Sequence, residues 1–407
     1  MTLHANVLLL HVMKNVLPDH IRTADEIGHL TVITEPGHVQ QYGADVDVHV
    51  VESVQNLEVM RAKVLEILRE RRIDRIFAPF ELGQSAAGYL RSYFGLPGTG
   101  LDVANNFSNK YAMKQRLAAG GLPVADFRLA AGLHQVPEAA DRLGWPVVIK
   151  PVIGGGSINV SVIDGPEDFE RFCRTPAAER IRALPVPLLA ERFVRMSAEY
   201  HFDAIVEDGQ VLFSVGSRYS SPVLARDSFL GSCILPADDP NRRRMTELHA
   251  QAVNSLGLDS GVTHMEFFET PDGLLAGEIA CRPAGGSFPE CIRMHTGVDL
   301  WRACLELQLG LTPKLELKAE EGVLAHCHLP VSPGLIVEQT PEEELAALPS
   351  VVRVDMLRRK GDVVPAHLNS ASASAVVYLR GDSPEEAEAA MRRVVEAYHI
   401  EIVPESS

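Results

Sequence analysis

Basic residues are scarce in this sequence, and their scarcity excludes one broad class of function. The 407 residues include 38 Lys and Arg but 54 Asp and Glu, which gives a net charge of −16. A chain this acidic lacks the general attraction for phosphate backbones on which non-specific nucleic-acid binding depends. We therefore expect no nucleic-acid partner, and we expect any bound anion to be held by a local group of basic side chains.

Long apolar runs and cysteine motifs are missing as well. No run approaches the roughly 20 residues that cross a bilayer. The apolar stretch at residues 5–12 has neither the basic start nor the small-residue cleavage site of a signal peptide. The six cysteines form no Cys-x-x-Cys pair and no zinc-ligand spacing, which indicates reduced thiols. These absences predict a cytoplasmic protein without a membrane partner.

Two familiar nucleotide-binding motifs are also absent. The sequence has no Gly-x-x-x-x-Gly-Lys-Ser/Thr loop, and no Gly-x-Gly-x-x-Gly follows the first predicted strand. What the first hundred residues do contain is a series of short apolar runs separated by a helical pattern. The runs lie at residues 5–12, 29–34, 46–51 and 73–79. Strands that alternate with helices indicate an open parallel α/β domain, here over residues 1–100.

The pattern changes after residue 100, to helices mixed with antiparallel hairpins. The segments 199–219 and 263–282 each alternate around an Asp-Gly turn, at Asp208-Gly209 and Asp272-Gly273. Beyond residue 310, further strands precede a helix with Ser383 as its N-cap and Glu386 three residues later, the spacing of a capping box. The sequence therefore predicts an α+β fold for residues 101–407.

Lys150 and the glycine run that follows it are the first candidates for chemistry. Lys150 ends a predicted strand, and Gly154, Gly155, Gly156 and Ser157 follow. Glycines allow backbone amides to approach phosphate oxygens, and a lysine adds positive charge. A mobile turn without a ligand is the alternative.

Carboxylates are the second group of candidates. Glu266 and Glu278 lie on the two strands of one predicted hairpin, with Arg282 beyond. Two carboxylates on one face suit Mg²⁺, and an arginine beside them could stabilise a phosphoryl or acyl-phosphate oxygen. Glu191 and Glu199 flank a segment that leaves a strand, where Glu199 could bind a ribose. For all four glutamates, solvated surface residues are the alternative.

Taken in order, these residues and Lys110 resemble the ATP-grasp superfamily, closest to the carboxylate–amine ligase branch that includes enzymes similar to biotin carboxylase and to L-amino acid ligases. The resemblance implies a pre-ATP-grasp α/β domain at 1–100 and a two-lobed ATP-grasp module at 101–310. It also implies a lid at about 150–200 and a C-terminal α+β portion at 311–407.

The resemblance also assigns site residues. It implies ATP phosphate contacts from Lys110, Lys150, Gly154, Gly155, Gly156 and Ser157, adenine contacts from Glu191 and Val194, a ribose contact from Glu199, Mg²⁺ or Mn²⁺ ligands at Glu266 and Glu278, and a catalytic role for Arg282. One position departs from the family. Ala280 stands where the family usually has an asparagine that ligates the metal.

Five further residues are candidates for substrate contacts. They are His264, Arg218, Arg226, Gly285 and Gly286. Lys114, in contrast, is expected on a helix surface rather than in the site.

The implied reaction activates a substrate carboxylate with ATP as an acyl phosphate and joins it to an amine. Two alternatives stay open. The acceptor could be a thiol, such as the phosphopantetheine arm of a carrier protein, or the chain could bind nucleotide without turnover. The sequence leaves the oligomeric state open, with a dimer as one alternative.

Overall fold

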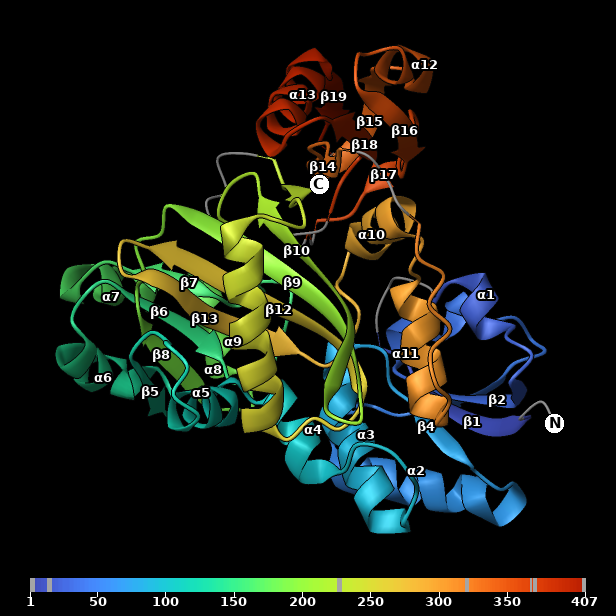
Figure 1. The fold of residues 1–407 in the computed structure, drawn as a ribbon. Helices are drawn as coiled ribbons and strands as arrows, with labels where there is room; N and C mark the ends of the chain where they lie inside the picture. Colours follow the sequence, from blue (N-terminus) through green and yellow to red (C-terminus); the bar gives the residue numbers. More distant parts are fainter. Residues whose placement is uncertain are drawn as a thin grey trace.

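An open sheet of four parallel strands, in the order β3-β2-β1-β4, begins the chain. The computed structural model describes residues 4–12, 17–224, 229–318, 322–366, 368 and 372–404 (Figure 1). The first elements are β1 (Ala5–Leu10), α1 (Asp19–Arg22), β2 (Ile27–Thr34), the 3-10 helix η1 (Pro36–Gln41), β3 (Asp47–Val50), α2 (Leu57–Glu70), β4 (Arg75–Phe77) and α3 (Glu81–Phe94). The predicted parallel α/β architecture is confirmed.

Strand β1 shows why this segment folds as a central parallel strand. Its apolar run is buried on both faces, as parallel strands covered by helices usually are. Leu9 packs with Val32 and Phe77 on one side. Leu8, on the other side, belongs to a cluster that includes Met60 of α2.

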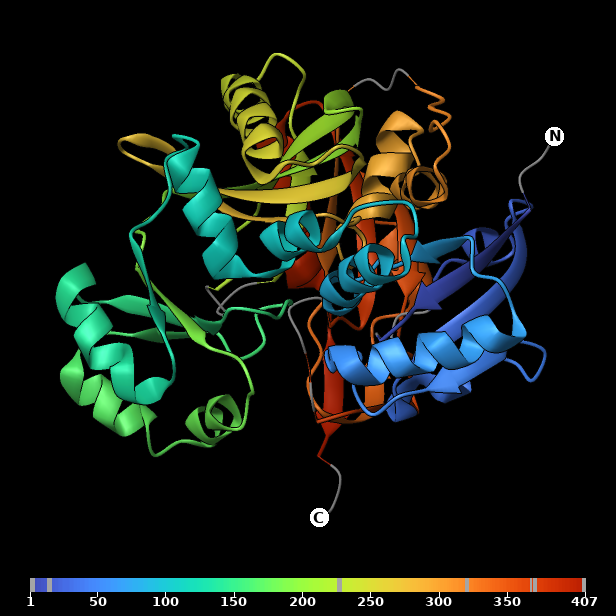
Figure 2. The same ribbon diagram turned by 90° about the horizontal axis from the view of Figure 1, so that it is seen from below.

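A small antiparallel sheet in the order β5-β8-β6-β7 forms a separate body. Two helices lead into it, α4 (Leu101–Ser108) and α5 (Lys110–Ala119). Its elements are β5 (Phe127–Ala130), η2 (Leu133–Gln135), α6 (Val136–Leu143), β6 (Val147–Pro151), β7 (Ser161–Ile163), α7 (Pro166–Phe172), α8 (Pro176–Arg182) and β8 (Leu188–Arg192). Figures 1 and 2 show this body and the N-terminal sheet on opposite sides of the molecule, with a larger sheet between them.

The large sheet has eight strands in the order β13-β12-β9-β10-β11-β14-β18-β16. Its strands and adjoining helices are β9 (Ala198–Glu207), β10 (Gln210–Tyr219), β11 (Gly231–Ile234), α9 (Pro240–Leu256), β12 (Gly261–Thr270), β13 (Gly273–Ala280), α10 (Phe288–Thr296), α11 (Leu300–Leu309), β14 (Val323–His328), β16 (Val351–Met356) and β18 (Ala375–Gly381). Both predicted hairpins, β9–β10 and β12–β13, are confirmed. The sheet runs without interruption past residue 310, because β14 pairs with β11.

The remaining elements complete the C-terminal part. They are β15 (Gly334–Gln339), α12 (Glu342–Ala346), β17 (Val363–Val364), α13 (Pro384–Ala397) and β19 (Ile400–Val403). Ser383 caps α13 by accepting a bond from the Glu386 amide at 3.3 Å, but the Glu386 carboxylate accepts from the Asp382 amide rather than from Ser383. Among the described residues, no helix is long and apolar enough to cross a membrane.

The two faces of the large sheet differ in character, because side chains alternate along each strand. On one face Phe202 and Met265 pack against Met245 and Leu248 of α9. The opposite face is apolar toward α11, with Ile205 of β9 in that core. Further along, the same face carries polar side chains that lead to the candidate site.

A β-bulge in the β12–β13 hairpin sets the position of two glutamates. Met265 pairs with Ile279 and Phe267 pairs with Ala276, so Gly277 and Glu278 together oppose Glu266. Gly277 lies very close to its neighbour: a Cβ there would lie 2.9 Å from the Glu266 carbonyl oxygen. Bulges of this kind often re-aim side chains beside active sites.

We expect Gly277→Ala to lower the free energy of unfolding by about 1–3 kcal/mol, because the added methyl group forces the two strands apart. Gly37→Ala is the matched control, since a Cβ at Gly37 meets nothing within 4 Å. Urea denaturation of both variants checks this expectation. Equal stability of Gly277→Ala and wild type would show that the bulge accommodates a side chain.

Candidate active site

Three lysines from two elements converge on two glutamates, one on the small sheet and one on the large sheet. Lys150 on β6 contacts Glu191 of β8 and lies 2.6 Å from Glu278 of β13. Lys110 Nζ lies 3.4 Å from the other Glu278 oxygen, and Lys114 Nζ lies 2.8 Å from Glu191. The network therefore joins α5, the small sheet and the large sheet through buried charges.

Mutual neutralisation keeps these buried groups charged. Burial lowers the pKa of Lys150, but the charges of Glu191 and Glu278 outweigh burial and raise it. Burial raises the pKa of Glu278, yet Lys110 and Lys150 bring it down to about 2. The network thus holds fixed positive charge where a polyphosphate could bind.

The start of α5 is built to aim Lys110. The Asn109 side chain caps the helix by accepting bonds from the amides of Tyr111 and Ala112 at 3.1 and 3.2 Å. The Lys110 amide donates to the Val152 carbonyl at 2.8 Å, which ties the helix to the end of β6. From there the Lys110 ammonium donates to the Gly154 carbonyl in the glycine loop.

The glycine loop has the backbone shape that its sequence predicts. Gly154, Gly156 and Ser157 have φ angles of 154°, 63° and 57°, in the positive range that favours glycine. A Cβ at Gly155 would lie 3.5 Å from Glu81 of α3, so the loop approaches the N-terminal sheet.

Two further carboxylates, Glu199 and Glu266, lie beside the lysine network, but basic side chains offset less of their negative charge. Burial and the charge of Glu266 raise the pKa of Glu199 to about 8, although Glu199 accepts a bond from the Val223 amide at 2.7 Å. The pKa of Glu266 is also raised, by burial and by Glu278, against the lowering effect of His264. Clustered acidic oxygens of this kind are stabilised by a cation.

The residues present fit a divalent metal. Glu266 and Glu278 offer carboxylate oxygens, the ligands that Mg²⁺ prefers, and their strands hold them side by side across the bulge. Ala280 pairs laterally with His264 of β12, and its methyl group offers no metal ligand.

Arg282 forms an ion pair that the sequence did not reveal. Its Nε lies 2.8 Å from Glu81, and its guanidinium also donates to the Pro283 carbonyl at 2.8 Å. Glu81 begins α3 just after β4, and ligands of open α/β sheets bind outside such carboxyl ends of strands. That position was the signal that could have identified Glu81. Gln84 secures the arrangement, because its amide donates to the Cys281 carbonyl at 3.0 Å.

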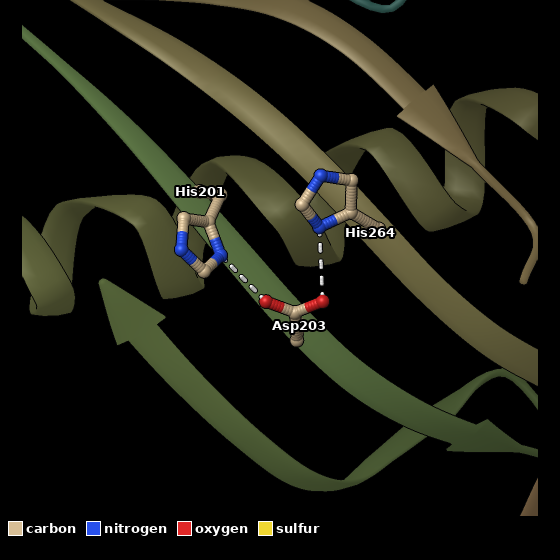
Figure 3. A group of neighbouring side chains, drawn as sticks. All are labelled: His201, Asp203 and His264. Carbon is tan, nitrogen blue, oxygen red and sulfur yellow. Dashed lines mark hydrogen bonds and ion pairs between the residues drawn. The ribbon is translucent and has the colours of Figure 1, made fainter. Parts of the chain in front are cut away.

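His264 belongs to a second buried cluster that sequence reasoning missed (Figure 3). Asp203 on β9 accepts bonds from the Nδ1 atoms of His201 and His264, at 2.7 and 2.9 Å. Burial lowers the pKa of His264, but the charges of Asp203 and Glu266 outweigh it and raise that pKa. The alternation Glu199-x-His201-x-Asp203 within a buried strand was the available signal.

Other predicted residues lie outside this arrangement. Arg218 pairs with Tyr200 and Cys233 across the sheet, so it lies on the face opposite His201. We therefore leave Arg218 out of the site, and Arg226 lies outside the described residues.

The prediction for Lys114 is wrong: its side chain is 1% exposed and its ammonium faces Glu191. Gly285 and Gly286 lie exposed between Arg282 and α10, and Val194 follows β8 in the segment before β9.

This fold and site define an ATP-grasp protein. Residues 115–286 match the family model of the ATP-grasp domain, and residues 328–403 match that of the L-amino acid ligase C-terminal domain 2.

A similar sequence and a similar structure identify the family within the ATP-grasp superfamily. The chain is 32% identical over 384 residues to an L-arginine-specific L-amino acid ligase of Bacillus subtilis. The aligned region covers 93% of this chain and 92% of that protein. The crystal structure of an L-amino acid ligase from Bacillus licheniformis superposes with a TM-score of 0.76 at 20% identity, over 98% of this chain and 99% of that one. This protein belongs to the L-amino acid ligase family, the ADP-forming carboxylate–amine ligases of the ATP-grasp superfamily.

A more distant solved structure shares the fold. The biotin carboxylase domain of a Hydrogenobacter thermophilus 2-oxoglutarate carboxylase, solved with MgADP, superposes with a TM-score of 0.67 at 18% identity, over 98% of this chain and 91% of that one. ATP-grasp enzymes use ATP with Mg²⁺, and the predicted ligase class is confirmed.

The buried position of Lys114 leads to a test of the network. Lys114→Met should lower the free energy of unfolding by about 3 kcal/mol, because it leaves one Glu191 oxygen buried without its partner. The double variant Lys114→Met with Glu191→Gln should recover part of that loss, as thermal or urea unfolding would measure. A Lys114→Met protein as stable as wild type would contradict the structural role of the pair.

Proposed function

We propose that this enzyme activates the carboxylate of one amino acid with ATP and joins it to the amine of a second. One observation supports the proposal most strongly: Lys110 and Lys150 converge on Glu278, and the adjoining glycine loop approaches Glu81, the partner of Arg282. The family assignment favours an amine as acceptor over the thiol that the sequence left open.

The phosphates of ATP would bind at Lys110, Lys150 and the glycine loop 154–157. Glu191 would serve mainly to hold Lys150, because its carboxylate pairs with Lys114 and Lys150. We therefore assign the adenine contacts to the backbone of the 191–194 segment and the ribose contact to Glu199. The small-sheet body would act as the lid over this nucleotide, within the 101–310 module.

Glu266 and Glu278 would hold Mg²⁺ at this site. When bound, the metal offsets the negative charge of the phosphates. Lys150, which pairs with Glu278 in the structure, would then be available to the phosphates.

The chemistry requires positioning and charge stabilisation rather than a protein nucleophile. A carboxylate oxygen of the first substrate attacks the γ-phosphorus, and the bond to ADP breaks. The amine of the second substrate then attacks the acyl carbon, which releases phosphate and a proton. Arg282 would stabilise the acyl-phosphate oxygens during both steps.

Arg282 and Glu81 together support an amino acid as the activated substrate. An α-amino acid carries a carboxylate and an ammonium group, and this pair offers one group of each opposite charge. Glu81 would bind the ammonium while Arg282 binds the carboxylate. The relative's specificity for L-arginine does not by itself extend to this chain.

Replacing Lys150 tests the nucleotide site. Lys150→Ala should weaken ATP binding by about 1.5–3 kcal/mol, the contribution of a bond to a charged group. Lys63→Ala is the control, because Lys63 pairs with Glu66 on the surface helix α2, away from the proposed site. Calorimetry with ATP measures both variants, and unchanged affinity in Lys150→Ala would refute the assignment.

Replacing the two metal glutamates tests the cation site. Glu278→Ala should abolish ADP release, whereas Glu266→Ala should leave a trace at high Mg²⁺. Ala280→Asn should lower the Mg²⁺ concentration needed for half-maximal rate, because an amide oxygen is added.

The measurement is initial rate against Mg²⁺ concentration, with the exposed Glu70→Ala as control. Near-normal rates in Glu278→Ala would show that both glutamates are ordinary strand residues and not metal ligands.

A further inference from the structure

Three residues that lie side by side in the large sheet, Asp203, His264 and Ala280, connect the buried cluster of Figure 3 with Glu266 and Glu278. His264 pairs with Asp203 on one side and with Ala280 on the other. Cross-strand neighbours have Cβ atoms about 4.5–5.5 Å apart, so His264 lies beside Ala280, whose methyl group offers no ligand.

Asp203 fixes which ring atom of His264 faces the glutamates. Its carboxylate accepts the Nδ1–H bond at 2.9 Å, and the Nε2 atom lies on the far side of the ring (Figure 3). Nε2 lies 4.0 Å from Glu266 Oε1. Histidine ligands usually have this arrangement, in which one nitrogen donates to a carboxylate and the other faces the metal.

His201 makes the Asp203 support rigid rather than providing a separate metal site. Its Nδ1 bonds to the other Asp203 oxygen at 2.7 Å, and its Nε2 pairs with Ser232 Oγ at 2.7 Å. The rings of Tyr219 and Phe288 pack against it, with centroids 4.9 and 4.8 Å away. With both nitrogens engaged, His201 holds Asp203 so that Asp203 can hold His264.

We propose that His264 Nε2 is a cation ligand together with Glu266, and that it supplies a ligand beside Ala280, which offers none. The 4.0 Å separation is compatible with a shared ion, because two ligands each about 2.1 Å from one metal lie at most about 4.2 Å apart.

A nitrogen ligand changes which cation binds best. Imidazole suits transition metals, whereas Mg²⁺ prefers oxygen alone. This position should therefore favour Mn²⁺ over Mg²⁺. The inference rests on the proposed function, since it takes Glu266 as a metal ligand.

The test measures metal binding without turnover. The full chain, with nitrogen-15 in its histidines, is mixed with Mn²⁺ and unlabelled ADP, and pulsed electron paramagnetic resonance detects nitrogen bonded to the metal. Nitrogen-15 coupling is expected in wild type, and the isotope separates histidine from adenine nitrogen. Mn²⁺ bound without nitrogen-15 coupling would overturn the inference.

Two matched variants separate ligation from folding. His264→Asn keeps an amide donor near the place of Nδ1, so the Asp203 contact is retained, but it removes Nε2. It should lose the coupling and bind Mn²⁺ about tenfold or more weakly. Adding Ala280→Asn to His264→Asn should restore cation binding, now without preference for Mn²⁺. A His264→Asn protein that keeps the wild-type coupling and affinity would overturn the inference.

The experiment also separates the proposed metal site at Glu266 and Glu278 from the proposed His264 ligand. If Glu278→Ala weakens Mn²⁺ binding while His264→Asn does not, the metal assignment holds and this inference fails. If wild type binds no Mn²⁺ with ADP, both fail.

Discussion

The ion pairs of Lys150 are the interaction on which the rest of the site depends. This one ammonium bridges Glu191 of the small sheet and Glu278 of the large sheet, so it connects the two bodies that would enclose ATP. Burying charges is costly unless each has a partner, and here the protein supplies the partners itself. A polyphosphate that arrives with its own cations can exchange partners with this network, because it brings both signs of charge. The proposed site therefore has its charges paired before a ligand arrives, and a nucleotide with its cations could replace those partners.

Strand alternation lets one sheet provide both a core and a reaction surface. On β9, Phe202 and Ala204 are buried against α9, while Glu199, His201 and Asp203 face the other way. The polar side chains can be buried because they bond to one another and to backbone amides, as the Glu199 contact with the Val223 amide illustrates. Rigid strands thus hold the acidic and basic groups in fixed register, which loops would do less well.

The sequence predicted what depends on local pattern and on the order of residues. The parallel N-terminal sheet, both Asp-Gly hairpins and the family followed from apolar periodicity and from the series that runs from Lys110 to Arg282. Contacts between distant segments did not follow. Glu81 and Arg282 are 201 residues apart in the chain, and nothing in either neighbourhood indicates the other. Lys114 was misjudged for the same reason, because its burial comes from segments distant in the chain: its ammonium faces Glu191 and donates to the Ala276 carbonyl at 3.3 Å.

The Arg282–Glu81 pair connects the N-terminal sheet to the proposed active site. Each side chain is less than a fifth exposed, at 18% and 13%, so neither charge is well hydrated. The pair neutralises itself in the free protein, and a zwitterionic substrate could take the place of that contact without leaving either charge buried alone. A simple anion would satisfy only Arg282 and strand Glu81, which would cost free energy. If this pair binds the first substrate as proposed, it would favour amino acids over simple carboxylates before any side-chain pocket is considered.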